Sequence, residues 1–166
     1  MKNTEVSYFA GLFDGEGSFV IQVGVRNGNG KEKNKYIWFA PRMAVTLKYG
    51  TTVLYEMHKH FDGHIYNYKE GIVRWQLTKY EECLRMAKLL CPYLRIKQTI
   101  AKRFIRALEL FPEKGNYVNF LKGSRKWKLN DALTVAEIGM NLNPHKAKST
   151  IHQEKIFQNI KGIYVE

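Results

Sequence analysis

The chain has 166 residues, enough for one domain with a hydrophobic core of ordinary size. Its 27 lysines and arginines against 15 acidic residues give a formal net charge of +12, which argues against an enzyme of small neutral metabolites and favours a polyanionic partner. The chain has no apolar run of roughly 18 residues and no signal peptide, and its basic residues are spread along the whole length. We therefore expect a protein that binds nucleic acid and not a membrane. We also expect it to be intracellular, in a compartment that the sequence does not specify.

The first segment, "NTEVSYFAGLFDG", predicts a helix. Asn3 or Thr4 fits the N-cap, Glu5 lies in the first turn, and Gly15 stands where the helix would stop. From Ser18 the apolar residues alternate with polar ones, which predicts a strand. The polar run "NGNGKEKNK" predicts the tip of a long hairpin.

The returning strand is "YIWFAPRMAVTLK", in which Pro41 indicates a sheet edge or a bulge. A helix is then predicted over 51–61, capped by Thr51 or Thr52 and stopped by Gly63. The stretch "HIYNYKEGIVRWQL" predicts a second hairpin with a tight turn at 69–71.

Helices dominate the rest of the chain. "TKYEECLRMAKLL" is helical up to Pro92, and a tail from Asn116 predicts two or three helices broken near "NLNPHKAKST". Between them, one helical stripe closed by Pro112 carries the apolar residues Ile96, Ile100, Phe104, Ala107, Leu108 and Phe111.

The predicted order is therefore αββαββα followed by a helical tail. We expect an α+β fold in which the two hairpins form a four-stranded antiparallel sheet. The prediction is a single domain over 1–166, with its core in 4–112 and the helical tail in 113–166.

Strand parity divides the side chains of this sheet into two faces. The odd positions are apolar and predict the core: Phe19, Ile21, Val23, Phe39, Met43, Val45, Val73, Trp75 and Leu77. The even positions carry donors, acceptors and flat rings: Gln22, Arg26, Arg42, Thr46, His64, Tyr66, Tyr68, Arg74 and Gln76. A β-ribbon with such a face can read base edges in the major groove, although a solvated face of an antiparallel sheet is also polar. The lysines at 31, 33, 35, 48 and 126 suit contacts with phosphates.

The segment "FAGLFDGEGSF" has a composition that a helix in a core would avoid, because each glycine costs backbone entropy. Ala10, Gly11 and Gly15 are spaced so that another helix could approach closely. Asp14 and Glu16, the latter expected just past the helix end, could bind a divalent cation such as Mg²⁺ or simply belong to a helix stop and turn. Spacing alone leaves both alternatives open.

The histidines on the predicted helix and the two cysteines are better explained as structural residues than as a metal or catalytic site. His58 and His60 stand two apart on a predicted helix and point to different sides, which argues against a structural zinc site. Cys83 and Cys91 have no metal-ligand spacing and fit reduced thiols of the core.

The stretch "FAGLFDGEG" resembles the LAGLIDADG motif of homing endonucleases, and the element order resembles the single-motif members, which work as homodimers. The likeness covers about 4–112 well and the tail weakly. It implies that motif helices of two subunits pack at the dimer axis, through Ala10, Gly11, Phe13, Asp14 and Gly15. It also implies that Glu16, where many members have Asp, binds the catalytic metal together with the carbonyl of Gly15. The implied cation is Mg²⁺, for which Mn²⁺ or other divalent cations can substitute.

Two further positions carry the resemblance or depart from it. "PYLRIKQ" matches a stretch of such proteins in which a basic residue polarises the metal-bound water network, and the matching residue is Lys97. The alternative is a solvated lysine on a basic helix. "AVTLK" has Leu47 where relatives often place a polar residue that holds a water, followed by Lys48, which joins the expected DNA contacts.

The function implied is that of an intron-encoded homing endonuclease, a homodimer that makes a double-strand break in a long pseudo-palindromic DNA site and leaves short 3′ overhangs. Two alternatives use the same fold: an RNA maturase that assists splicing of its host intron, and a DNA-binding regulator without cleavage. Neither needs Glu16 together with Lys97, so the presence of both favours the nuclease.

Overall fold

We describe a computed structural model of the chain over residues 2–27, 35–49, 51–111, 118–119, 127–142 and 150–165. The helices are α1 (Asn3–Glu16), α2 (Thr51–Phe61), α3 (Tyr80–Leu90), α4 (Gln98–Glu109), α5 (Leu129–Asn141) and α6 (Thr150–Val165), with short 3₁₀ turns at Lys69–Gly71 and Cys91–Tyr93. The strands are β1 (Gly17–Asn27), β2 (Lys35–Lys48), β3 (His64–Asn67), β4 (Ile72–Leu77) and β5 (Val118–Asn119).

The sheet has the predicted antiparallel hairpins in the order β1-β2-β4-β3. This confirms the α+β class and the αββαββα order. The short strand β5, which the sequence analysis missed, pairs with β2 at Trp38 and Phe39. Pro41 pairs with Ile21 of β1 and falls in β2 between the segments that pair with β5 and β4. Among the described residues, none pairs with Pro41 on the side of β2 that faces β4 and β5.

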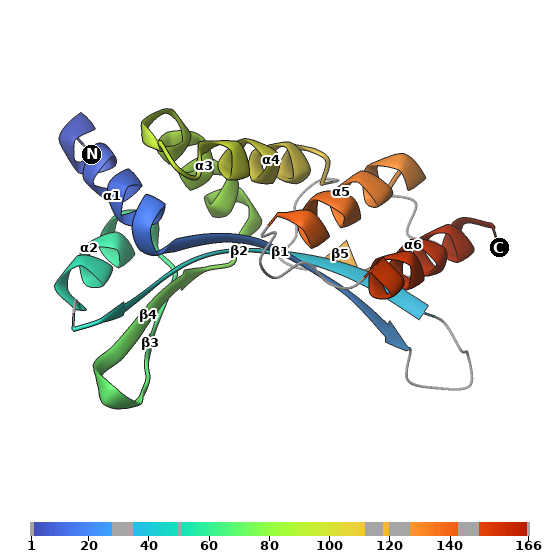
Figure 1. Cartoon of the computed structure of the whole chain (residues 1–166), viewed down its shortest axis with the longest axis horizontal. Helices are drawn as coiled ribbons and strands as arrows, with labels where there is room; N and C mark the ends of the chain where they lie inside the picture. Colours follow the sequence, from blue (N-terminus) through green and yellow to red (C-terminus); the bar gives the residue numbers. More distant parts are fainter. Residues whose placement is uncertain are drawn as a thin grey trace.

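The sheet forms an arch whose upper side is covered by α1, α3, α4 and α5, while its lower side carries no helix (Figure 1). The odd-numbered strand residues lie under the helices, and the side chains predicted for the core are all buried: Phe19, Ile21, Val23, Phe39, Met43, Val45, Val73, Trp75 and Leu77. The helices contribute Phe13, Leu54, Met86 and Phe104 to the same cluster. Among the described residues, none of the helices combines the length and the apolar character of a membrane span.

The ends of α1 differ from the prediction. The N-cap is Lys2, whose backbone N–H donates to Glu5 Oε2 at 2.6 Å, so Asn3 and Thr4 lie inside the helix. At the other end, the helix continues through Gly15 to Glu16, because the Gly17 N–H still donates to the Phe13 carbonyl. Glu16 is therefore the last helical residue, and β1 begins directly after it.

The stripe predicted around α4 is also shorter than expected. The helix begins at Gln98, so Ile96 lies in the turn before it and is 77% exposed. The later members Phe104, Ala107 and Leu108 are buried as predicted.

The tail forms two helices, which agrees with the predicted range. Trp127 is 5% exposed, and its ring lies 5.2 Å from that of Phe39 and 5.1 Å from that of Phe111. On α5, a Cβ at Gly139 would lie 3.0 Å from the Ile21 carbonyl oxygen, so this helix lies close to β1. The tail helices thus share the hydrophobic cluster of the sheet.

Gly17 is the motif glycine that this chain's own packing requires. A Cβ at Gly17 would lie 2.3 Å from Phe13 Cδ1 and 2.7 Å from the Phe13 Cα. We expect Gly17→Ala to lower the free energy of unfolding by about 1–3 kcal/mol, as overpacking does. Urea unfolding measures this loss. Gly162→Ala is the control, because nothing lies within 4 Å of a Cβ there, and it should be neutral or stabilising; equal losses in both variants would contradict the packing argument.

Candidate active site and nucleic-acid interface

The end of α1 is joined to the turn before α4 by one carboxylate. Asp14 Oδ2 accepts the backbone N–H of Arg95 at 2.7 Å, and Oδ1 accepts those of Ile96 at 3.2 Å and Lys97 at 2.9 Å. These donors precede or begin the first turn of α4, where backbone N–H groups lack helical partners. Asp14 thus fixes the turn that carries Lys97.

The pKa of Asp14 reflects these contacts. Partial burial alone would raise the pKa, but the N–H donors of Arg95, Lys97 and Ile96, with the charge of Lys97, hold it below the ordinary value. Asp14 is therefore an anion at neutral pH, committed to contacts within its own chain. Its oxygens have partners on the 95–97 turn, and its place at a dimer interface stays a prediction.

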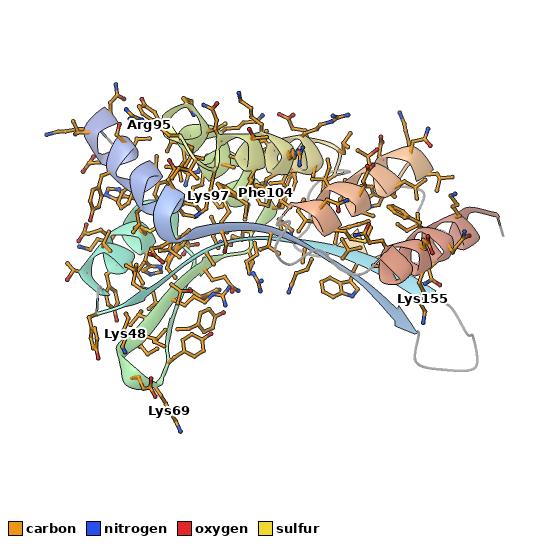
Figure 2. The ribbon with its side chains drawn as sticks, in the orientation of Figure 1. Lys48, Lys69, Arg95, Lys97, Phe104 and Lys155 are labelled. Atoms are coloured by element: carbon orange, nitrogen blue, oxygen red, sulfur yellow. The ribbon has the colours of Figure 1, made fainter. Side chains whose placement is uncertain are left out.

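Lys97 reaches back to the last turn of α1 (Figure 2). Its Nζ donates to the carbonyl oxygen of Phe13 at 3.0 Å and to that of Gly15 at 3.1 Å. Burial lowers the pKa of Lys97, while the charges of Asp14 and Glu16 act in the opposite direction. The structure therefore brings Lys97, Gly15 and Glu16 together, three residues that the sequence analysis placed in one site.

The donor set at this end of α1 fits a hard divalent cation. Glu16 is exposed and supplies a carboxylate, and the Gly15 carbonyl has a second lone pair besides the one used by Lys97. Within the described ranges, no three histidine, cysteine or acidic side chains cluster as metal ligands. A cation here would therefore take few ligands from the protein and keep water or substrate oxygens, which is typical of Mg²⁺.

The exposed face of α1 is lined by small or polar residues, with one large exception. Gly11 and Gly15 are exposed, and a Cβ at either would meet nothing within 4 Å in this chain. Ser7 lies on the same face, with the large Tyr8 beside it. Ala10 and Phe13 are fully buried, so their prediction as interface residues is wrong: they face the chain's own core. The surface free for a partner is thus centred on Gly11 and Gly15.

The lower face of the sheet carries the residues predicted to contact DNA. All of those whose side chains are described are exposed or half-exposed: Gln22, Arg42, Thr46, Lys48, His64, Tyr66, Tyr68, Arg74 and Gln76. The side chains of Arg26 and Lys35, and all of Lys31, Lys33, Lys126 and the hairpin tip at 28–34, lie outside the described residues. Lys48 and Lys69 lie at the lower left in Figure 2, by the outer end of the β3–β4 hairpin.

Trp38 is a member of this face that the sequence analysis overlooked. It pairs with Gly24, and a Cβ at Gly24 would lie 2.4 Å from the indole, so the ring covers the glycine. Its even position was the available signal. Leu47, by contrast, packs against the core and offers no polar atom.

The described cysteines and histidines add no second site. Cys83 and Cys91 are buried, and burial raises the pKa of the Cys83 thiol to about 12, which keeps it protonated. Its Sγ lies 3.5 Å from the Leu77 carbonyl oxygen. His58 and His60 are exposed on α2.

We expect Asp14→Asn to lower the free energy of unfolding by about 2 kcal/mol at pH 7, because an amide cannot accept three N–H bonds as a carboxylate does. The folded-state pKa of Asp14 is lowered from 3.8. Its stabilisation is therefore complete above about pH 4 and is lost as the pH falls through the lower folded value. Urea unfolding at pH 7 and pH 3 should show the difference between wild type and variant shrinking in acid.

Asp62→Asn is the matched control, since Asp62 is an exposed partner of Lys79. It should cost much less than Asp14→Asn at pH 7. Equal costs for the two variants, or an Asp14→Asn cost unchanged at pH 3, would contradict the role given to Asp14.

The fold has close counterparts among solved structures. The archaeal intron-encoded homing endonuclease I-Vdi141I, complexed with DNA, superposes with a TM-score of 0.75 at 13% identity, over 100% of both chains. The homing endonuclease I-CvuI, in complex with its target, gives 0.68 at 15% identity, over 96% of this chain and 94% of that one. I-SmaMI, bound to an uncleaved DNA target, gives 0.66 at 18% identity, over 92% of this chain and 49% of that one. At these identities the likeness concerns the fold.

The sequence itself is matched at the level of a family. No curated protein sequence matches the chain. The family model described as LAGLIDADG endonuclease matches residues 9–110, more than half of the chain, including the whole glycine-carboxylate motif and Lys97. The chain therefore belongs to the LAGLIDADG endonuclease family, whose members are site-specific DNA endonucleases.

Proposed function

We propose that this homing endonuclease acts as a homodimer that cuts both strands of a pseudo-palindromic DNA site, with Glu16 and Lys97 of each protomer serving one strand. The observation that carries the proposal is the arrangement at the end of α1. There Lys97 Nζ bonds the Gly15 carbonyl beside the exposed Glu16, next to a helix face centred on two glycines with no neighbour in the chain.

The two glycines support the dimer. Each glycine in a helix costs up to about 1 kcal/mol relative to alanine, and nothing in this chain restricts a side chain at Gly11 or Gly15. A second motif helix that crosses here would explain the two glycines, because small residues let two helix backbones approach closely. The chain also spans all of I-Vdi141I but about half of I-SmaMI, so a second copy would supply what the longer protein has in one chain.

A twofold dimer sets the form of the target. Identical reading faces related by a twofold axis require half-sites related by the same axis, hence a nearly palindromic site. Double-stranded DNA is the partner that the family assignment supports, and the net charge of +12 agrees with it. No observation favours the maturase or the non-cleaving regulator.

Divalent-cation use is supported by the donor set and by relatives. I-CvuI is described with calcium on its own target, and with magnesium and uncleaved DNA on the target of I-CreI. We propose Mg²⁺, with Mn²⁺ as a substitute. When bound, the cation supplies Lewis-acid stabilisation of charge on the attacking and leaving oxygens.

The chain's own residues then have distinct tasks. Glu16 holds the cation through a flexible carboxylate at the start of the sheet. Lys97, whose pKa is lowered by burial, remains a cation at neutral pH. It balances the carboxylates of Asp14 and Glu16, and its ammonium lies where a phosphate or its water could accept a proton from it. Asp14 keeps that ammonium in place through the 95–97 turn.

Glu16→Gln should reduce cleavage by at least about 100-fold, because the neutral amide binds a divalent cation far more weakly. DNA binding should be largely retained, since the lower face of the sheet is unchanged. A randomised duplex library cleaved in Mg²⁺ supplies the site, and single-turnover cleavage and binding are then measured on it.

The control for this experiment is Glu109→Gln, which removes an exposed carboxylate paired with Lys88. It should cut and bind as the wild type does. Cutting by Glu16→Gln at a rate similar to wild type would refute the metal assignment.

Gly11→Leu should convert the dimer to a monomer, because an isobutyl group on the free face of α1 prevents a close helix crossing. Sedimentation velocity measures the change. Gly162→Leu is the matched control: it places the same side chain in equally open space, but on α6, and should leave the dimer intact. A normal dimer with Gly11→Leu would exclude this face as the interface.

A further inference from the structure

Two arginines occupy the middle of the lower sheet face on neighbouring strands. Arg74 on β4 pairs with Thr46 of β2, and Arg42 stands four residues before Thr46 on β2. Between them lies Ala44, whose side chain is on the open face and yet is only 2% exposed. Longer side chains therefore lie across Ala44. Its neighbours on this face are Gln76 directly opposite on β4, Arg42 two residues away on its own strand, and Arg74 diagonally on β4.

Among the described residues, neither arginine has an ion-pair partner. The Nε atoms of Arg42 and Arg74 are both buried and have no hydrogen-bond partner. The side chains listed above for this face include no aspartate or glutamate.

This arrangement is costly in the free protein. Burial lowers the pKa of Arg42, and the nearby charge of Arg74 lowers it further, with Tyr68 acting in the opposite direction. A guanidinium remains charged under these conditions, so the cost appears as unsatisfied donors and like-charge repulsion. Acceptors from outside the chain can reach the half-exposed arginine side chains, although not their buried Nε atoms, and would offset the like-charge repulsion.

We propose that Arg42 and Arg74 are specificity-determining residues, and that each reads a guanine through O6 and N7 in the major groove of one half-site. This inference rests on the proposed DNA-cleaving function. A planar fork of donors matches the two acceptors of guanine, and a half-buried stem loses little conformational entropy on binding. Exposed lysines at the margin, such as Lys48 and Lys69, instead suit phosphates.

The sheet also indicates where the guanines stand. Arg42 pairs with Val20, which is four residues beyond Glu16. At about 3.3 Å per strand residue this is about 13 Å, the length of about four base pairs. We therefore expect the guanine read by Arg42 about four base pairs outward from the cleaved phosphodiester. Arg74 pairs with Thr46, the residue after the Gly17 partner Val45, so the guanine that it reads should stand closer to the cleaved bond.

The test begins with cleaved sites selected from a randomised duplex library by wild type, Arg42→Lys and Arg74→Lys. Lysine keeps the charge and loses the fork, so each variant should lose a guanine preference at its own position by about 5- to 150-fold. The other positions should remain as selected by wild type. Lys48→Ala is the comparison, and it should weaken binding on all sequences alike.

A second measurement uses only the wild-type protein, so it does not depend on whether a variant folds. Replacing the selected guanines by 7-deazaguanine removes N7 alone, and wild-type binding should weaken by about 10-fold at each. Suppose that wild type enriches a site. If the guanine preference of that site survives in both lysine variants, or if binding is insensitive to 7-deazaguanine, the assignment of the two arginines is wrong, while the endonuclease proposal still stands. If wild type enriches no site, the proposed function itself fails, and the pair assignment with it.

Discussion

The contact on which the site depends is the carboxylate of Asp14 on the backbone of the 95–97 turn. It links segments more than 80 residues apart in the chain and fixes the direction in which α4 leaves the turn. Lys97 then returns to the last carbonyls of α1. The last carbonyls of α1 thereby receive hydrogen bonds from another element, and the Lys97 ammonium is held near Glu16.

The sequence predicted the elements that have a clear period. Alternation identified both hairpins and the two faces of the sheet, and the glycine-carboxylate stretch located the site. It could not separate the motif residues by role, because helical spacing alone does not show that Ala10 and Phe13 face the core. The contacts of Asp14 with the 95–97 turn could not be predicted either, because its partners are backbone groups, and these leave no trace in the side-chain pattern. Likewise, two residues of β5 are too few to show alternation.

The three motif glycines answer different physical demands. Gly17 is required by contact with Phe13 inside the chain, whereas Gly11 and Gly15 have no neighbour in it. A single sequence pattern therefore combines a constraint on folding with one that, in the proposed dimer, acts between protomers. The sheet shows a similar division: odd positions stabilise the fold, and even positions such as Arg42 and Arg74 remain available at a cost to it.

Glu16 ends α1 and Gly17 begins β1, so no linker stands between the carboxylate proposed to hold the metal and the strand proposed to carry reading residues. Adding or deleting one residue at this junction would turn every reading side chain of β1 inward and every core side chain outward. In the proposed nuclease, the distance between the cleaved bond and the bases that β1 recognises is thus fixed by this junction. In this part of the protein, a new target site can therefore be recognised only by exchanging side chains, and not by inserting or deleting residues.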